Sequence, residues 1–130
     1  MATYTVQKLP DEPIVIFANG ADFQIKTELI PAIIEIKSLL DCQSTPVYLV
    51  NDLTDAPAPS PNEIMNAATH LAIGADALYQ HPKIKCIIAI TPFDVIRMAY
   101  GEMLRSLIHN RDIQIFRTLA EGLAYARTHQ

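Results

Sequence analysis

The sequence predicts an α/β protein with a mostly parallel five-stranded sheet, an N-terminal antiparallel hairpin and four covering helices. Two observations lead to this fold class. Short runs of apolar, often β-branched residues, typical of buried strands, alternate with longer segments whose apolar residues recur at helical spacing. Strands that alternate with helices form largely parallel sheets through right-handed crossovers. A chain of 130 residues suffices for a single domain, 1–130.

The first two predicted strands form a hairpin. Thr3–Leu9 alternates weakly between apolar and polar residues, which suits an edge strand with one solvated face. Pro10–Pro13 has the composition of a turn. Ile14–Phe17 is a short continuous apolar run, which indicates a buried strand. We therefore expect these two strands to pair in antiparallel orientation.

Residues 23–29 can be interpreted in two ways. Apolar and polar residues alternate there, as in a strand, and the preceding Asn19-Gly20 favours a tight hairpin turn. We prefer an extended loop that leads into a helix, and the strand remains the alternative. Pro31 favours a helix start close to it, because proline is tolerated in the first turn and destabilises a helix interior by about 3 kcal/mol. The helix then continues to about Cys42.

The rest of the chain alternates between strands and helices. The predicted strands are Pro46–Val50, Ile84–Ile90 and Asp112–Phe116, and the predicted helices are Ile64–Tyr79, Phe93–Ile108 and Leu119–Arg127. The strand 84–90 is strongly apolar, so we expect it to be central and covered on both faces. The alternating prolines of residues 56–61 indicate an extended connector. Gly74 lies within the first of these helices and indicates a close packing contact or a break.

Three of these helix starts share one local design. The stretches 60–63 and 118–121 fit the S/T-x-x-E capping box, in which the hydroxyl accepts a backbone hydrogen bond and the carboxylate returns one. The stretch 91–94 follows the same plan with the shorter acid. Proline stands at the first helical position after Ser60 and after Thr91. A capping role weakens any functional interpretation of these hydroxyls.

Composition excludes several function classes. Half of the residues are hydrophobic, 18% are charged, and the net charge is −4, which argues against nucleic-acid binding because such proteins usually present a basic face. The apolar runs are shorter than the ~18 residues that a membrane span needs. The first four residues do not resemble a signal peptide. We therefore expect a cytoplasmic protein with no nucleic-acid partner and no membrane span.

Motifs for nucleotide binding and serine catalysis are missing from the sequence. The four glycines are Gly20, Gly74, Gly101 and Gly122. Their spacing forms neither the G-x-G-x-x-G fingerprint nor a P-loop. No serine is flanked by the glycines of a G-x-S-x-G nucleophile turn. We expect no cofactor and no catalytic residue.

Histidines and cysteines form no recognisable site either. The four histidines are His70, His81, His109 and His129. None pairs with another at the i, i+4 spacing of a helical metal motif, and the favourable C-terminal end of a helix explains His109. Cys42 and Cys86 are isolated, and we interpret both as unreactive core residues. No metal-binding residue is expected.

The loop after the third predicted strand holds the candidate site residues Asp52, Thr54, Asp55 and Ser60. In an open α/β sheet, ligands bind at the carboxyl ends of the strands. The two carboxylates would suit Mg²⁺ or a phosphoacceptor role. Aspartates also bond their own backbone in turns, which is the interpretation that we prefer. The loop remains a candidate for interaction or ligand binding.

Three stretches carry a family resemblance. They are Pro46–Asp55, His81–Ile84 and Ile115–Ala126, the last similar to an F-x-T/S-L-x-E-A-L pattern with Gly122 in place of the usual alanine. With the order of elements, they make the chain from Tyr4 to Arg127 resemble the SpoIIAA-like (STAS-like) domains of bacterial proteins. That group is related to anti-sigma-factor antagonists.

The resemblance implies a non-enzymatic interaction or regulatory domain. The antagonists carry a kinase-target serine in a D-S-S-G-like turn, and here the corresponding stretch Asp55–Pro61 lacks the serine pair and the glycine. The group is also likened to Sec14-type lipid-binding folds, which implies that a small apolar ligand could bind.

Three functional hypotheses follow. The first is a cytoplasmic bacterial STAS-like protein that is not catalytic and acts in regulation through an unknown protein partner, with a homodimer as the commonest form of self-association. The second is a protein that binds a small apolar or lipid-like ligand under the helices. The third is a metal-dependent enzyme that uses Asp52 and Asp55.

Overall fold

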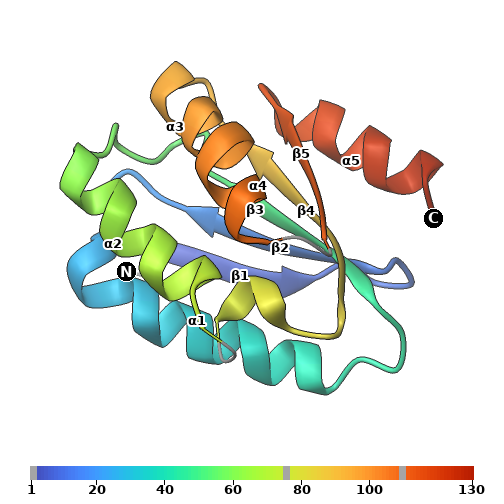
Figure 1. The fold of residues 1–130 in the computed structure, drawn as a ribbon. Helices are drawn as coiled ribbons and strands as arrows, with labels where there is room; N and C mark the ends of the chain where they lie inside the picture. The colour runs from blue at the N-terminus through green and yellow to red at the C-terminus, as the bar shows by residue number, and fades with distance from the viewer. Residues whose placement is uncertain (1–2, 75–76, 109–110) are drawn as a thin grey trace.

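The computed structural model describes residues 3–74, 77–108 and 111–130 (Figure 1). Within them, one sheet contains β1 (Tyr4–Lys8), β2 (Ile14–Asn19), β3 (Val47–Asp52), β4 (Ile84–Ile90) and β5 (Asp112–Phe116). The helical elements are α1 (Ile25–Asp41), α2 (Pro61–Ala72), the 3-10 turn η1 (Leu78–Gln80), α3 (Asp94–Met98), the π-helix η2 (Ala99–Leu104), α4 (Arg105–Leu107) and α5 (Leu119–Thr128). The elements α3, η2 and α4 are continuous, and we call residues 94–107 the third helix. The predicted fold class is confirmed.

The strands lie in the sheet in the order in which they follow one another along the chain, β1-β2-β3-β4-β5. β1 and β2 are antiparallel, which confirms the predicted hairpin, and the other neighbouring pairs are parallel. Each parallel step moves in the same direction, so right-handed crossovers place α1, α2 and the third helix on one face of the sheet. α5 covers the other face, where it packs against β3, β4 and β5 (Figure 1).

Two hydrophobic cores therefore lie on the two faces of the sheet. The larger core joins the sheet to α1, α2 and the third helix, and the smaller one joins it to α5. β4 contributes Ile87 and Ala89 to the first and Ile88 and Ile90 to the second, which confirms that it is covered on both faces; it is an interior strand between β3 and β5. Among the described helices, none has the length and apolar character needed to cross a membrane.

The start of α1 differs from both interpretations of residues 23–29. The helix begins at Ile25, six residues before Pro31, so the predicted start near Pro31 is wrong and residues 25–29 form neither a strand nor a loop. Phe23 is buried between the rings of Tyr4 and Phe17, and the backbone N–H of Gln24 donates to the Glu28 carboxylate at 2.7 Å. These contacts fix the first turn, and the exposed position of Pro31 makes its missing N–H tolerable.

The helix after the proline connector is shorter than predicted. α2 ends at Ala72, and Gly74 has a φ of +99°, which belongs to the left-handed region that commonly ends helices. Of the two interpretations of Gly74, the break is the correct one. Ala75 lies outside the described residues, and Tyr79 belongs to the separate 3-10 turn η1.

The three predicted caps differ in the structure. Ser60 forms the full capping box of α2, with Glu63 N to Ser60 Oγ at 3.2 Å and Ser60 N to Glu63 Oε1 at 2.9 Å. Thr118 accepts from Glu121 N at 3.2 Å, but its hydroxyl rather than its backbone N–H donates to the Glu121 carboxylate. Both residues cap their helices, as predicted.

The capping role predicted for Thr91 is wrong. The third helix begins at Asp94 with Phe93 as its N-cap residue, so Pro92 is not in the helix. Thr91 is fully buried, and its hydroxyl accepts a hydrogen bond from the backbone N–H of Phe93 at 3.1 Å. The Thr91 hydroxyl therefore has its hydrogen bond within the short turn that follows β4. The helix begins only after this turn, at Asp94.

A close approach between α5 and β4 explains Gly122. A Cβ at this position would overlap Ile90 Cδ1 and would lie 3.1 Å from Ile88 Cγ2. Both isoleucines are completely buried, so their methyl groups have little room to move. The glycine therefore lets the α5 backbone lie directly on β4.

We predict that Gly122→Ala lowers the free energy of unfolding by about 1 kcal/mol. Overpacking a core costs about 1–3 kcal/mol, which exceeds the gain of about 1 kcal/mol in helix propensity. Ile90→Val removes the overlapping methyl group, so the alanine should cost less in that background. Urea denaturation measures the coupling.

Gly101→Ala is the control, because a Cβ there meets Ile115 Cδ1 at an ordinary 3.7 Å. Equal effects of Gly122→Ala in the wild-type and Ile90→Val backgrounds would contradict this packing account.

Candidate functional site

The loop after β3 uses its first carboxylate to hold its own turn. Asp52 Oδ1 accepts from the backbone N–H of Thr54 at 3.1 Å and from its hydroxyl at 2.5 Å. Asp55 is exposed, and Ser60 lies further on as the cap of α2. Within residues 3–74, 77–108 and 111–130, no three His, Cys, Asp or Glu side chains gather as metal ligands would. The preferred turn interpretation agrees with this geometry.

A cavity of about 230 Å³ lies beside this loop, on the face of the sheet that α1, α2 and the third helix cover. Its base is formed by the carboxyl ends of β2 and β3, and residues 56–59 of the proline connector form part of its rim. The candidate loop thus contributes Leu53 and the connector to the cavity, whereas Asp52, Thr54 and Asp55 are not among its lining residues.

Small side chains create this space. Ala67 and Ala68 of α2 and Ala99 of the third helix all line the cavity. Larger apolar residues such as Phe17 and Leu71 complete the walls. Sites for small ligands are commonly concave and mostly apolar, with a few polar groups that fix the orientation of the ligand.

A triangle of hydrogen bonds stands at the base of the cavity. Asn51 Nδ2 donates to the hydroxyls of Tyr79, at 3.0 Å, and Tyr100, at 2.6 Å, and the two hydroxyls are 2.7 Å apart. All three side chains are buried, and Asn51 and Tyr100 line the cavity. Burial raises the pKa of Tyr79 well above its ordinary value and raises the pKa of Tyr100 to about 12, so both phenols stay protonated.

Two amide oxygens at the carboxyl end of the sheet have no partner among the described residues. They are Asn19 Oδ1 and Asn51 Oδ1, on side chains that are 8% and 4% exposed. Both residues line the cavity, and they come from the neighbouring parallel strands β2 and β3. A buried acceptor without a hydrogen bond is energetically costly, so such atoms indicate a hydrogen-bond partner other than the described residues.

The sequence contains a signal for these two residues that our interpretation missed. Each asparagine lies at or next to the last position of a strongly apolar strand, where the strand opens toward the ligand-binding edge of an α/β sheet. We assigned Asn19 to a turn and gave weight to the charged Asp52 and Asp55 instead. The buried asparagines line the cavity, whereas the charged Asp52 and Asp55 do not.

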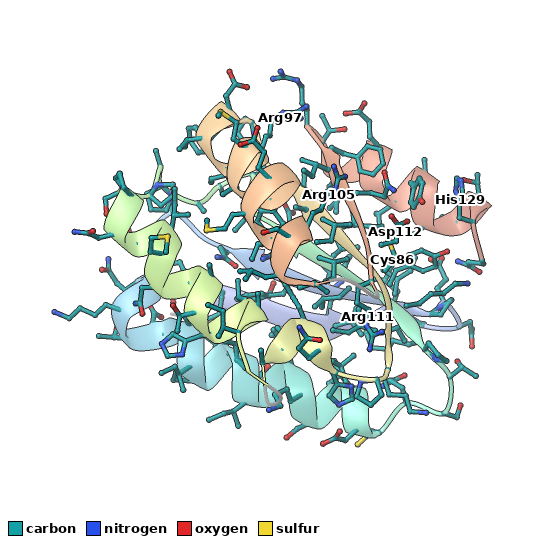
Figure 2. The ribbon with its side chains drawn as sticks, in the orientation of Figure 1. Cys86, Arg97, Arg105, Arg111, Asp112 and His129 are labelled. Atoms are coloured by element: carbon teal, nitrogen blue, oxygen red, sulfur yellow. The ribbon has the colours of Figure 1, made fainter. Side chains whose placement is uncertain are left out.

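A second polar cluster lies on the α5 face (Figure 2). Cys86 Sγ is 3.7 Å from Asp112 Oδ2, and the hydroxyl of Tyr125 donates to the same carboxylate oxygen at 3.1 Å. The ring of His129 stacks on that of Tyr125, with 4.0 Å between centroids. Burial, and then the Asp112 carboxylate, raises the pKa of the Cys86 thiol to about 12. This thiol is protonated at neutral pH and is therefore a poor nucleophile.

The remaining candidate residues have structural or exposed positions. Cys86 is buried as predicted, but the prediction that Cys42 is a core residue is wrong, because it is exposed at the end of α1. His81 accepts from the backbone N–H of Lys83 and lies 2.7 Å from the Asp41 carboxylate, which ties the turn before β4 to α1. His109 lies outside the described residues.

Comparisons with solved structures support the fold. An uncharacterised protein of the DUF3478 family with a SpoIIAA-like fold, from Shewanella loihica PV-4, matches with a TM-score of 0.58 and 11% identity, over 95% of this chain and 91% of its own. An anti-sigma factor antagonist from Mycobacterium paratuberculosis matches with a TM-score of 0.53 and 16% identity, over 96% and 93% of the two chains. Neither protein-family models nor curated sequences gave a match.

These similarities define the class of protein by its fold. The chain has a SpoIIAA-like α/β fold, with β1 and β2 antiparallel and the other strands parallel. The resemblance expected from the sequence is confirmed at this level.

We predict that iodoacetamide at pH 8 modifies Cys42 much faster than Cys86 in the folded protein. A thiol with a pKa of about 12 is thiolate in about one molecule in ten thousand at that pH, and Cys86 is buried as well. Peptide mass spectrometry over time measures both reactions. In guanidinium chloride both thiols should react, which controls for any difference in how well the two peptides are detected. Rapid modification of native Cys86 would contradict the low reactivity assigned to this thiol.

Proposed function

We propose that this chain is a non-catalytic binding protein that takes a small, mostly apolar ligand into the cavity beside Asn19, Asn51 and Tyr100. The observation that carries this proposal is the cavity itself, which combines apolar walls with two buried, unpaired acceptors. It lies at the carboxyl ends of neighbouring parallel strands, which is the usual ligand-binding edge of an open α/β sheet. Of our hypotheses from the sequence, this was the second.

The chemistry of the lining supports binding over catalysis. Glu63 is the one charged side chain among the described lining residues, and its carboxylate accepts the Ser60 backbone hydrogen bond of the capping box. Tyr100 stays protonated because its pKa is about 12. General acid–base catalysis needs a group that exchanges its proton near neutral pH, and a phenol that stays protonated does not meet this need.

The size of the cavity sets the size of the ligand. A cavity of 150 Å³ holds a benzene molecule, so on the same scale a volume of about 230 Å³ takes about nine heavy atoms. Ethylbenzene and its relatives with one polar group fall in this range and are convenient probes.

We predict that ethylbenzene shifts amide resonances of the cavity lining, such as that of Ala68, in a saturable way in ¹⁵N NMR spectra. Ala68→Leu fills part of the space, so it should weaken this binding about tenfold and raise the free energy of unfolding by about 0.5–2 kcal/mol. Ala124→Leu, on the exposed side of α5, is the matched control and should leave the binding unchanged. If ethylbenzene, 2-phenylethanol, phenylacetate and 2-phenylethylamine all fail to bind, the proposed function is wrong.

A second candidate function is regulation through a protein partner, as in our first hypothesis. An exposed apolar surface on α2 and the third helix favours it, with Met65, Val95 and Met98 exposed by 55%, 46% and 60%. We call these three residues the methionine surface. Methionine-rich surfaces adapt to protein partners because the side chain is flexible and polarisable. The likeness to an anti-sigma factor antagonist also supports a regulatory role in the bacterial cytoplasm.

We predict that Met98→Glu abolishes capture of such a partner from the native bacterium. A carboxylate at this position would be buried without a counter-charge in the complex. Ile34→Glu is the matched control, since Ile34 is 61% exposed on α1, away from the methionine surface. The measurement is quantitative mass spectrometry of captured proteins. If the same proteins are recovered with wild type and Met98→Glu, this candidate function is wrong.

A further inference from the structure

We infer that the cavity selects a neutral ligand with a hydroxyl group on an apolar body, and discriminates against carboxylates and amines. The inference rests on the proposed function, because it names the class of ligand for the same cavity. It follows from the hydrogen atoms and lone pairs that Asn19, Asn51 and Tyr100 leave unused.

The triangle at the base of the cavity has one hydrogen atom more than it needs. The Asn51 amide supplies two N–H groups, and Tyr79 and Tyr100 supply one O–H each. The three contacts of the triangle use three of these four hydrogens: both N–H groups and one O–H. One phenol hydrogen therefore remains without a partner inside the triangle.

The position of the two rings decides which hydroxyl keeps its hydrogen. Tyr100 lines the cavity, whereas Tyr79 is completely buried and is not one of the described lining residues. If Tyr100 donated to Tyr79, the hydrogen of Tyr79 would be left in a closed apolar layer, at the cost of an unsatisfied buried donor. The reverse arrangement, in which Tyr79 donates to Tyr100, leaves the Tyr100 O–H free to donate into the cavity.

The residues that line the cavity therefore carry one free donor and two unpaired acceptors. The donor is the Tyr100 hydroxyl, and the acceptors are Asn19 Oδ1 and Asn51 Oδ1, which have no partner among the described residues. A ligand hydroxyl matches both types, because it accepts from Tyr100 through a lone pair and donates its hydrogen to one of the amides. The apolar lining would surround the rest of the ligand.

Charged head groups fit this arrangement less well. A carboxylate has acceptors alone, so it would face the two amide oxygens without a hydrogen to share, and none of the described lining residues is Lys, Arg or His. An ammonium group could donate to both amides, but it has no lone pair for the Tyr100 hydroxyl. Each would also bring a charge into a mostly apolar site, which is costly unless the charge is paired.

Four probes of similar size test this selectivity: 2-phenylethanol, ethylbenzene, phenylacetate and 2-phenylethylamine. Titrations at pH 7, followed by ¹⁵N NMR, give their dissociation constants with the full chain. We expect 2-phenylethanol to bind at least about tenfold more tightly than the carboxylate and the amine, since a buried unpaired charge costs more than a tenfold change in affinity. Equal or tighter binding of either charged probe would overturn the inference.

The contribution of the amide is isolated by Asn19→Leu, which removes one acceptor and keeps the approximate volume. Comparing 2-phenylethanol with ethylbenzene in each variant cancels effects of shape and stability. The affinity ratio of alcohol to hydrocarbon should fall about threefold to tenfold, as expected for one neutral hydrogen bond. Asn66→Leu, the same change at an exposed position of α2 outside the lining, should leave the ratio unchanged.

Tyr100→Phe provides a second variant in case Asn19→Leu does not fold, and it should lower the same ratio. An unchanged ratio in a folded variant of either residue would overturn the inference while leaving the proposed function intact. Failure of all four probes to bind would overturn both. The two failures are therefore distinguishable in a single set of titrations.

Discussion

The hydrogen-bonded triangle of Asn51, Tyr79 and Tyr100 is the constraint on which the rest of the helical layer depends. It joins β3, η1 and the third helix, which are far apart along the chain. In an apolar layer these polar groups are stable only when they satisfy one another. The triangle thereby ties these three elements together beside the cavity that the small alanines of α2 and the third helix line.

This arrangement places uncharged polar groups beside the cavity. Burial raises the pKa values of Tyr79, Tyr100 and the Cys86 thiol, so these three groups stay neutral. Neutral donors and acceptors in a mostly apolar cavity discriminate between ligands by the match of their hydrogen bonds. The same groups are poorly suited to proton transfer at neutral pH.

Much of the fold could be predicted from local sequence patterns, because strands, caps and crossovers depend on neighbouring residues. Ser60 and Thr118 cap helices as their motifs indicate, and the apolar run 84–90 is an interior strand that is almost wholly buried. The incorrect predictions have their cause in tertiary packing. The α1 start depends on the packing of Phe23 against rings from β1 and β2, and Thr91 is satisfied by the chain as it leaves the sheet.

The candidate site was harder to predict because its polar groups are uncharged and lie far apart in the sequence. Asn51 donates hydrogen bonds to Tyr79 and Tyr100, which lie 28 and 49 residues away along the chain, and no local sequence motif predicts such a contact. The charge of the acidic residues in the following loop favours a ligand site, but Asp52 accepts its hydrogen bonds within its own turn. The loop residues 53 and 56–59 reach the cavity through their apolar members.

The π-helix η2 affects how quickly the cavity can open. η2 carries Tyr100 between α-helical turns of only five and three residues, and segments of that length are not stable by themselves. π-helical turns are rare and are found mostly as short interruptions of α-helices. This wall of the cavity therefore relies on packing against the sheet, and we expect its local opening to set the residence time of any bound molecule, independently of how tightly that molecule is held.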